Sequence, residues 1–500
     1  MSSDRYLQAK ELADAGDVDA SWQIVKQLLV DNPLDPRALV TGSFLMRIGG
    51  RLPESYHFAR AATKFLPDDA APWINLGHAS AELWRLQEAE ECYKRALKCS
   101  NIGQGTLRRN TMLNFSAIYV DSARYAEAKA IAEEMLKIDP KDQLARANLG
   151  FCQLAMRDWS GWANYRSTIG TEFRPRLQYC GEPEWDGTHG LTVALHGEQG
   201  LGDEISFASM LPDAQAVCKK LILDCDSRLT GLFKRSFPGV HVYGTRKASQ
   251  LNWAKEDRKI DASLPMGQIG EYFRTTDDSF PGLPYLVPCP QRTQMWRSYF
   301  AGLGKPVIGI AWRGGIPKSN ARNRQWMLDD LLPLFRSIDA HYVSLQYKDA
   351  SKEIAAFLGR HPGVDIAQYP WATLTSDYDD TAALIAAMDH VFCMQTAVAH
   401  TAGALGIPAT VCVPFASQWR YGLAEDSIPW YRSLRVVRQK KHGSWTAEIE
   451  RGVGQLKADI SGLRGTEPQD EPAGAVRGSF SHIRPAGVEH HRPNGSDALA

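Results

Sequence analysis

The sequence predicts a fold of class α + α/β: a helical solenoid followed by two Rossmann-like lobes. A phrase that ends in proline recurs in the first third of the chain with a period of about 34 residues, which is typical of stacked helix pairs. From Leu191 on, short apolar runs alternate with helical patterns, as in parallel sheets with helical crossovers. The expected parts are helical repeats (1–156), an aromatic-rich bridge (157–189), two lobes (190–290 and 291–460) and a disordered tail (461–500).

The register of the repeats rests on two independent markers. Pro33 and Pro67 end similar phrases one repeat length apart. The spacing from Pro67 to Pro140 equals the spacing from Gly77 to Gly150, and both slightly exceed two repeat lengths, so one short insertion lies between them. This period, with its Leu-Gly pairs, is the tetratricopeptide (TPR) signature, and it favours a curved solenoid over an unrelated helical bundle. A groove for a protein or peptide partner is therefore expected.

Composition narrows the class of protein. Lys+Arg and Asp+Glu both total 57, so no net charge would attract the chain to nucleic acid or to an anionic membrane. The chain shows no signal-peptide pattern and no apolar run of about 18 residues, so no transmembrane segment is expected. Its 9 cysteines lie scattered, without zinc-site spacing. A cytoplasmic protein without a bound metal is predicted.

Ligands of parallel sheets bind at the carboxyl ends of the strands, and the first such loop reads "HGEQGLGD". Gly200 and Gly202 are expected to let the backbone approach a ligand, although the third glycine of a dinucleotide fingerprint is missing. Asp203 is either the N-cap of the following helix or a general base that deprotonates an acceptor hydroxyl. Glu198 and His196 are competing candidates for the base.

The second loop follows the apolar run "PVIGIA" and carries Trp312, Arg313 and Gly314, with Lys318 and Arg324 shortly after. An arginine directly after a buried strand can place its guanidinium fork on a diphosphate. The alternative is a basic loop that faces solvent. Clustering of these residues at a strand end favours the binding role.

The third loop opens a helix after another apolar run, with Gln395, Thr396 and Ala397 at its start. Free helix amides and the Thr396 hydroxyl together suit an anion. His400 either reaches the same anion or is packed in the core. Gln346, at the end of the run "YVSLQ", is expected to hydrogen-bond a base or a ribose.

Two facing lobes with such loops suit an enzyme that uses a nucleotide-sugar. The diphosphate is then the leaving group, and arginines and helix amides stabilise the charge that develops on it. No Asp-x-Asp pair stands in a loop suited to a metal ion, and Asp377, Asp379 and Asp380 are interpreted as helix caps. The sequence therefore favours a metal-independent reaction with no cofactor besides the nucleotide-sugar substrate.

Four ordered motifs carry a family resemblance: "LHGEQGLGDEISFASMLP", "IGIAWRGG", "DDTAALIAAMD" and "TAVAHTAGALGIP". They resemble bacterial TPR glycosyltransferases, whose catalytic half is similar to the lipopolysaccharide heptosyltransferase group (glycosyltransferase family 9) of the GT-B fold. The resemblance implies an inverting transferase that holds the nucleotide mainly in the C-terminal lobe. The Gly-Asp pair of that group, which carries the proposed base, falls on Gly202 and Asp203, and its phosphate-side motif on 396–400.

One position departs from this pattern, because Gln395 stands where the group has an aspartate. A different donor, a weakened activity and a lost activity are all compatible with that change. The architecture is also similar to that of protein O-GlcNAc transferases and bacterial flagellin glycosyltransferases, in which the repeats present a protein acceptor. Sugar transfer to a protein hydroxyl is therefore predicted. The alternatives are a lipopolysaccharide heptosyltransferase-like enzyme and a non-catalytic TPR scaffold.

Overall fold

The computed structural model describes residues 2–171, 174–246, 251, 253–254, 259–315, 324–423 and 426–463. The chain up to Lys457 forms one compact unit, and residues 458–500 form a second, of which the described part is the end of a helix. The expected disordered tail lies, from residue 464 on, outside the described residues.

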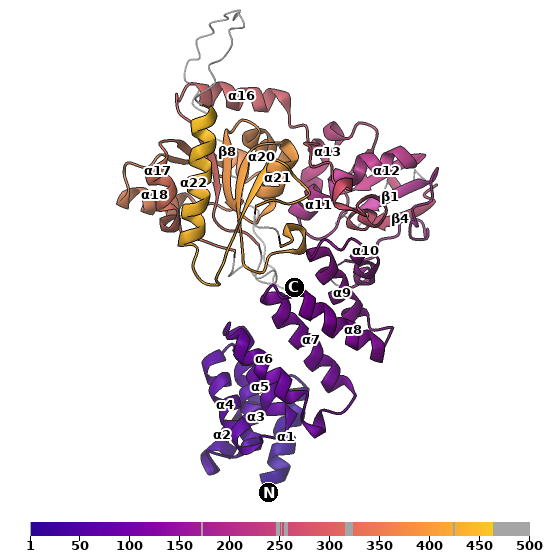
Figure 1. The fold of residues 1–500 in the computed structure, drawn as a ribbon, viewed down its shortest axis with the longest axis vertical. Coiled ribbons are helices and arrows are strands. Elements are labelled where there is room, and N and C mark those ends of the chain that lie inside the picture. The colour runs from indigo at the N-terminus through magenta and orange to yellow at the C-terminus, as the bar shows by residue number, and fades with distance from the viewer. Residues whose placement is uncertain are drawn as a thin grey trace, which may run out of the picture. The chain divides into compact units, whose positions relative to one another are not determined.

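The N-terminal region is built of consecutive helices that pack against one another (Figure 1). They are α1 (Ser2–Asp14), α2 (Val18–Asp31), α3 (Pro36–Ile48), α4 (Leu52–Phe65), α5 (Ala70–Glu82), α6 (Leu86–Ala96), α7 (Thr106–Asp121), α8 (Tyr125–Ile138), α9 (Gln143–Ala155) and α10 (Gly161–Tyr165). The phrases that end in proline lie between the pairs, where Asp35, Asp69 and Asp142 cap the next helix. This arrangement confirms the helical repeat.

A left-handed backbone conformation marks the turn inside each helix pair. It occurs at Gly16, Gly50, Trp84, Ala123 and Arg157, with positive φ at each. These turns follow one another at the repeat period, except that the step from Trp84 to Ala123 is longer. That step includes the turn Ser100–Ile102, which lies inside the stretch to which the sequence assigned one short insertion. The last of these turns joins α9 to α10, so α10 continues the repeat pattern.

Gly150 lets the helices of that last pair approach closely. A Cβ atom at this position would lie 2.5 Å from the backbone nitrogen of Tyr165 and 2.9 Å from the carbonyl carbon of Asn164. At the equivalent Gly77 the neighbour is instead the ring of Tyr93, a side chain that can move. The leucine-glycine pair seen in the sequence is therefore a helix-packing feature.

Gly150→Ala should lower the free energy of unfolding by about 1–3 kcal/mol, because the extra methyl group meets backbone that cannot yield. Urea unfolding monitored by circular dichroism measures this. Gly359→Ala in the helix Ser351–Arg360 is the matched control, since no atom lies within 4 Å of its Cβ position. An equal loss in both variants would mean that close packing at Gly150 is not the cause.

The first α/β lobe holds a four-stranded parallel sheet of order β3-β2-β1-β4. Its strands are β1 (Thr192–His196), β2 (Lys220–Asp224), β3 (His241–Tyr243) and β4 (Ala262–Pro265). Its helices are α11 (Leu201–Phe207), α12 (Leu211–Val217), α13 (Thr230–Ser236) and α15 (Gly270–Phe273). The bridge packs on this lobe: Trp162 and Trp185 are fully buried, and the indole N–H of Trp162 donates to the Arg274 carbonyl at 2.9 Å.

The second lobe holds a six-stranded parallel sheet of order β10-β9-β8-β5-β6-β7. Its strands are β5 (Val307–Ala311), β6 (His341–Ser344), β7 (Ile366–Gln368), β8 (His390–Met394), β9 (Ala409–Val413) and β10 (Leu434–Arg438). Its helices are α16 (Pro290–Ala301), α17 (Leu332–Ser337), α18 (Ser351–Arg360), α19 (Pro370–Thr373), α20 (Tyr378–Ile385), α21 (Ala397–Leu405) and α22 (Thr446–Leu463).

The strand order of the second lobe indicates where in the sheet a ligand crevice is expected. Counted along the lobe, the order is 3-2-1-4-5-6 from β7 to β10, which is that of doubly wound dinucleotide-binding sheets. In such sheets the ligand binds where the order reverses, here at the carboxyl ends of β5 and β8. Two of the three loops that the sequence singled out follow these two strands. The prediction of a solenoid followed by two parallel α/β sheets is confirmed.

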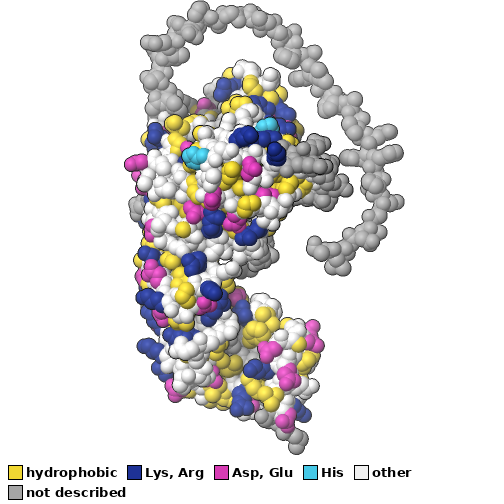
Figure 2. All heavy atoms as spheres, turned by 90° about the vertical axis from the view of Figure 1, so that its right-hand side faces the viewer, with side chains coloured by type: hydrophobic (Ala, Val, Ile, Leu, Met, Phe, Trp, Pro, Cys, Tyr) yellow, Lys and Arg dark blue, Asp and Glu magenta, His cyan; other side chains and the backbone are white. Residues whose placement is uncertain are grey.

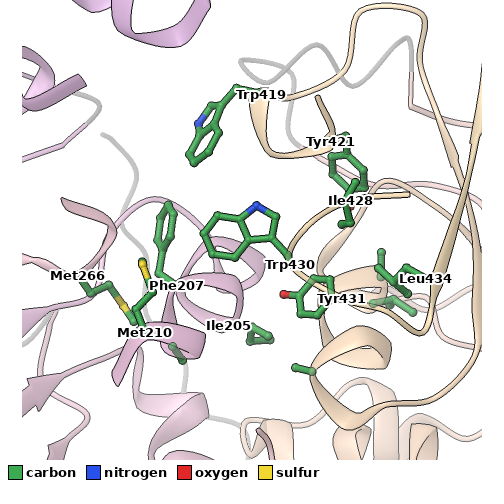
Figure 3. Packing of buried hydrophobic residues seen from close by; sticks show 14 of the residues in the cluster. Ile205, Phe207, Met210, Met266, Trp419, Tyr421, Ile428, Trp430, Tyr431 and Leu434 are labelled. Atoms are coloured by element: carbon green, nitrogen blue, oxygen red, sulfur yellow. The ribbon is translucent and has the colours of Figure 1, made fainter. Parts of the chain in front are cut away.

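Apolar side chains join the two lobes (Figure 3). Phe207 of α11 packs edge-on against Trp430, with ring centroids 6.1 Å apart, and Tyr431 lies on the same side of the second lobe. On the face drawn in Figure 2, Lys and Arg side chains are interspersed with Asp and Glu, as expected for a formal net charge of zero. None of the helices in the described part of the chain has the length and apolarity needed to cross a bilayer.

Candidate functional site

The loops after β5 and β8 touch each other. Gly314 follows β5, and a Cβ atom there would overlap with the side chain of Thr396, which follows β8. Gly314 therefore allows these two loops to contact each other, because any larger residue would collide with Thr396. The residues predicted on separate loops, Gly314 and Gln395 to Ala397, are brought together.

Gln395 is a buried polar group without a protein partner. Its side chain is 1% exposed, and neither its amide oxygen nor its amide nitrogen has a hydrogen-bond partner among the described residues. An unsatisfied buried polar atom costs about 1–3 kcal/mol, so native proteins keep few of them. The carboxamide can both donate to and accept from a bound hydroxyl or amide group.

The start of α21 is covered by the other lobe. Thr396 caps this helix, and its hydroxyl accepts from the Val398 N–H at 3.2 Å. A Cβ atom at Gly202 would lie 3.0 Å from the Cα of Ala397 and 3.2 Å from the Cδ2 of His400. Gly202 thus brings the first turn of α11 against α21, whereas the sequence had suggested close approach to a ligand.

Asp203 is the third residue of α11, and Gly200 is the N-cap, so the N-cap interpretation of Asp203 is wrong by three positions. One oxygen of its carboxylate accepts from the Gly200 N–H at 2.9 Å. The other forms an ion pair with Arg420, which comes from the turn Trp419–Tyr421 of the second lobe. Asp203 therefore lies where the lobes meet, with both carboxylate oxygens engaged.

Arg420 was not singled out in the sequence, although it stands between two aromatic residues. It is 4% exposed, and its guanidinium lies 5.2 Å from the ring centroids of both Phe207 and Trp419. Such contacts stabilise a desolvated guanidinium group. Its charge is balanced by Asp203, a residue 217 positions earlier in the chain.

The competing bases have other surroundings. The carboxylate of Glu198 is buried and paired with Arg174, with Nη2 and Oε1 3.0 Å apart, and it also accepts from the Gly267 N–H at 2.8 Å. This makes it part of the core of the first lobe. His196 is also buried, its ring nitrogens have no partner in the described part of the chain, and burial lowers its pKa to about 4.

Glu204 is a second residue that the sequence interpretation missed. It follows Asp203 and is fully buried, and burial raises its pKa to about 7. Its carboxylate lies 2.6 Å from the Arg246 guanidinium and accepts from the Asp226 N–H at 2.9 Å. A carboxyl group that titrates near neutral pH beside a strand end is a candidate for proton transfer.

The loop after β5 is held by hydrogen bonds from its neighbours. Glu353 of α18 accepts from the Trp312 indole at 3.1 Å and forms an ion pair with Arg313. With its amide oxygen turned toward the loop, Gln346 accepts from the Trp312 N–H at 2.7 Å and from the Arg313 N–H at 2.9 Å. Gln346 therefore orders the loop, and Arg313 keeps a half-exposed side chain beside Glu353.

The remaining basic residues of this loop differ in position. Lys318 lies outside the described residues. Arg324 is buried, and its carbonyl accepts from the Gly314 N–H at 3.1 Å. Burial lowers the pKa of Arg324, and the negative charge of Asp203 opposes that shift. The Asp203 carboxylate therefore acts electrostatically on Arg324.

His400 packs between two tyrosines. Its Nδ1 lies 3.3 Å from the Tyr431 hydroxyl and its Nε2 lies 3.5 Å from the Tyr421 hydroxyl. Burial lowers its pKa to about 3, so the ring is neutral at pH 7. Of the two roles left open by the sequence, the structure places His400 in packing against α11 and these tyrosines.

Asp377 caps α20 as predicted, accepting from the Asp379 N–H at 3.2 Å. Arg292 forms ion pairs with Asp377 and Asp380. Within the described ranges, no three His, Cys, Asp or Glu side chains gather in a way that could hold a metal ion.

Buried histidines predict a loss of stability in acid. Burial lowers the pKa of His78 and His196 to about 4 and that of His390 and His400 to about 3. An unfolded chain takes up protons on these groups below their ordinary pKa of about 6.5, and the folded chain does not. The stabilisation is therefore complete above about pH 6.5 and is lost as the pH falls toward 4.

His390→Asn should reduce the difference in unfolding free energy between pH 7.5 and pH 5 by about 2 kcal/mol. Urea titrations of both proteins at the two pH values measure this. His241→Asn is the control, because His241 is exposed. It should leave the difference in unfolding free energy between the two pH values unchanged. A variant that keeps the full pH dependence of the wild type would contradict the assignment.

Comparison with known proteins places the chain in a family. No family model matches it. It is 30% identical over 468 residues to protein FlbA of Caulobacter vibrioides, and this alignment covers 82% of this chain and 77% of FlbA. Among solved structures, MamA (16% identity, 32% of this chain and 91% of MamA) and the thermophilic TPR protein TTC0263 of Thermus thermophilus (18% identity, 34% and 90%) each give a TM-score of 0.28. The chain belongs to the FlbA family.

Proposed function

We propose that the chain is a glycosyltransferase of the GT-B type that moves a sugar from a nucleotide-sugar to a hydroxyl group of a protein acceptor. One observation carries the proposal: the strand ends of the two lobes face each other with complementary chemistry. The first lobe contributes the Asp203 carboxylate. The second contributes the buried guanidinium of Arg420, the start of α21 and the Gln395 amide, which has no hydrogen-bond partner among the described residues.

The proposed reaction is a single displacement. Asp203 removes the proton of the acceptor hydroxyl, and the oxygen attacks the anomeric carbon from the face opposite the diphosphate. The bond from that carbon to the diphosphate oxygen breaks, and its electron pair leaves with the diphosphate. Arg313, Lys318, Arg324 and the amides near Thr396 neutralise that charge. One displacement inverts the configuration at the anomeric carbon.

The repeats are proposed to hold the acceptor. Their helix pairs stack side by side, and solenoids of this kind present extended surfaces to protein partners. The helices from α6 to α10 share one continuous apolar core with the two lobes, so the solenoid and the lobes belong to one folded unit.

A thermal-shift panel tests the proposal. The full chain is heated with UDP, ADP, GDP, dTDP or CMP, and one of them should raise the Tm as its concentration rises. A ligand present at 100 times its Kd adds about 2.7 kcal/mol of stability. If none of these nucleotides changes the Tm, the nucleotide-sugar proposal is wrong.

Arg313→Ala should weaken binding of the nucleotide found in this panel by about 1.5–3 kcal/mol, the scale of a charge-assisted hydrogen bond. Isothermal titration calorimetry measures it. Arg360→Ala is the control, because Arg360 is an exposed arginine of α18 that pairs with Asp329 away from the strand ends. Unchanged affinity in Arg313→Ala would remove Arg313 from the phosphate site.

A non-catalytic scaffold is the second candidate, and one observation favours it. The first turn of α11 lies against the start of α21, and Asp203 is already paired with Arg420. A chain that keeps this contact permanently would have no room for a diphosphate there. Stabilisation by a nucleotide supports the transferase, and no response to any nucleotide supports the scaffold.

A further inference from the structure

The pair formed by Asp203 and Arg420 joins the two lobes at the candidate site. Arg420 is 4% exposed, and the side chain of Asp203 is 17% exposed, so the pair is largely removed from water. A buried guanidinium requires a counter-charge, because leaving it unpaired in the interior is strongly unfavourable. In this structure the counter-charge comes from the carboxylate of the opposite lobe.

Arg420 also keeps hydrogen-bonding capacity. Its Nη2 contacts Asp203 and the Gln418 side chain, while its Nε–H has no acceptor within the described part of the chain. A guanidinium can bind two oxygens of one phosphate through its fork. Arg420 is therefore suited to an anion with more oxygens than the single carboxylate oxygen it now contacts.

The same contact closes the start of α21. Gly202, next to Asp203, brings α11 to within van der Waals distance of Ala397. Directly before this helix, the Gln395 carboxamide is buried and unsatisfied in the described chain. The start of α21 and Arg420 are thus two groups suited to binding a ligand, and α11 covers the first while Asp203 neutralises the second.

We propose that Asp203 is an internal counter-ion that occupies the place of the donor's diphosphate on Arg420, and that the arriving diphosphate releases the carboxylate to act as the base. The inference rests on the proposed function and adds Arg420 to its binding residues. Before the donor binds, Arg420 holds the Asp203 carboxylate in an ion pair. A diphosphate carries more charge than a carboxylate, so it competes for Arg420 and leaves Asp203 bonded to the Gly200 N–H alone.

The released carboxylate then takes part in a balanced step. Asp203 gains the proton of the acceptor hydroxyl, the acceptor oxygen forms its bond to the anomeric carbon, and the bond to the diphosphate breaks. The diphosphate leaves with the electron pair and with Arg420 as its partner. Coupling in this order keeps the base inactive until a donor is present.

Binding of inorganic pyrophosphate and of UDP, ADP, GDP and dTDP to the full chain tests the inference by calorimetry. Asp203→Asn removes the internal competitor and should tighten binding of pyrophosphate about tenfold. Arg420→Gln should weaken it about tenfold. Asp213→Asn is the matched control, because Asp213 lies in α12 of the same lobe and pairs there with another buried arginine, Arg274. This variant should bind pyrophosphate with the affinity of the wild type.

The double variant Asp203→Asn/Arg420→Gln removes both charges of the pair, so it leaves no unpaired charge in the interior. It therefore keeps the test valid if Asp203→Asn alone does not fold. It should bind pyrophosphate as Arg420→Gln does. The inference is overturned if Asp203→Asn binds pyrophosphate no more tightly than the wild type does. It is also overturned if Asp203→Asn tightens pyrophosphate binding even when Arg420 is replaced. If either result is found and the wild type still binds a nucleoside diphosphate, the proposed function stands and only the exchange between Asp203 and the diphosphate is wrong. If pyrophosphate shows the exchange and no nucleotide binds, the proposed function fails by itself.

Discussion

Asp203→Asn should lower the rate of sugar transfer by about 10²- to 10⁴-fold, the contribution typical of a positioned general base. The amide oxygen of asparagine can still accept from the Gly200 N–H, so α11 keeps its first turn. An amide cannot take up the proton of the acceptor. The measurement is the initial rate of nucleoside diphosphate release, with the donor whose nucleotide raises the Tm.

Asp213→Asn provides the comparison for this loss. It is the same chemical change in the same lobe, on a carboxylate whose partner is Arg274. Its rate should equal that of the wild type. Full turnover by Asp203→Asn would assign the base to another residue, and Glu204, with a pKa raised to about 7 by burial, would be tested next.

Removal of the first four helices, residues 1–68, should reduce transfer to a protein acceptor by about 100-fold or more, because the acceptor is then no longer held near the site. The cut leaves Asp69 in place to cap α5. The most N-terminal cluster, formed by Ala9, Ala13, Val25 and Leu45, is separate from the core shared with the lobes. Repeat units can be removed from an end because each contacts only its neighbours.

Slow hydrolysis of the donor by water is the control for this truncation, since it needs the two lobes and no acceptor. It should be unchanged in the truncated chain. Mass spectrometry of the acceptor measures transfer, and release of nucleoside diphosphate measures hydrolysis. If the truncated chain transfers the sugar at the wild-type rate, these repeats do not select the acceptor.

The features that could be predicted from the sequence have local causes. The repeat period follows from one structural unit that recurs along the chain, and the same period reappears in the left-handed turns from Gly16 to Arg157. Strand and helix patterns in the lobes likewise depend on neighbouring residues. Because the strands are parallel, their carboxyl ends share one edge, and the loops with Gly314 and Thr396 could be predicted without knowing the strand order.

The details that the sequence did not reveal depend on contacts between distant residues. Glu198 looked like a candidate base, but Arg174, which precedes it by 24 residues, pairs with it in the core. Gly202 was expected to let the backbone approach a ligand, but the group that it approaches is Ala397 of the other lobe. Arg420 lies 217 residues from Asp203, and only the packing of one lobe on the other brings them together.

The most direct test of a nucleotide-sugar site between the lobes is consumption of a donor. The full chain is incubated with a set of UDP-, ADP-, GDP-, dTDP- and CMP-linked sugars in the presence of a chelator, and the released nucleotide is quantified by chromatography. One donor should be consumed at a rate that saturates with its concentration and that falls in Asp203→Asn. If every donor remains intact and none binds, the account is contradicted.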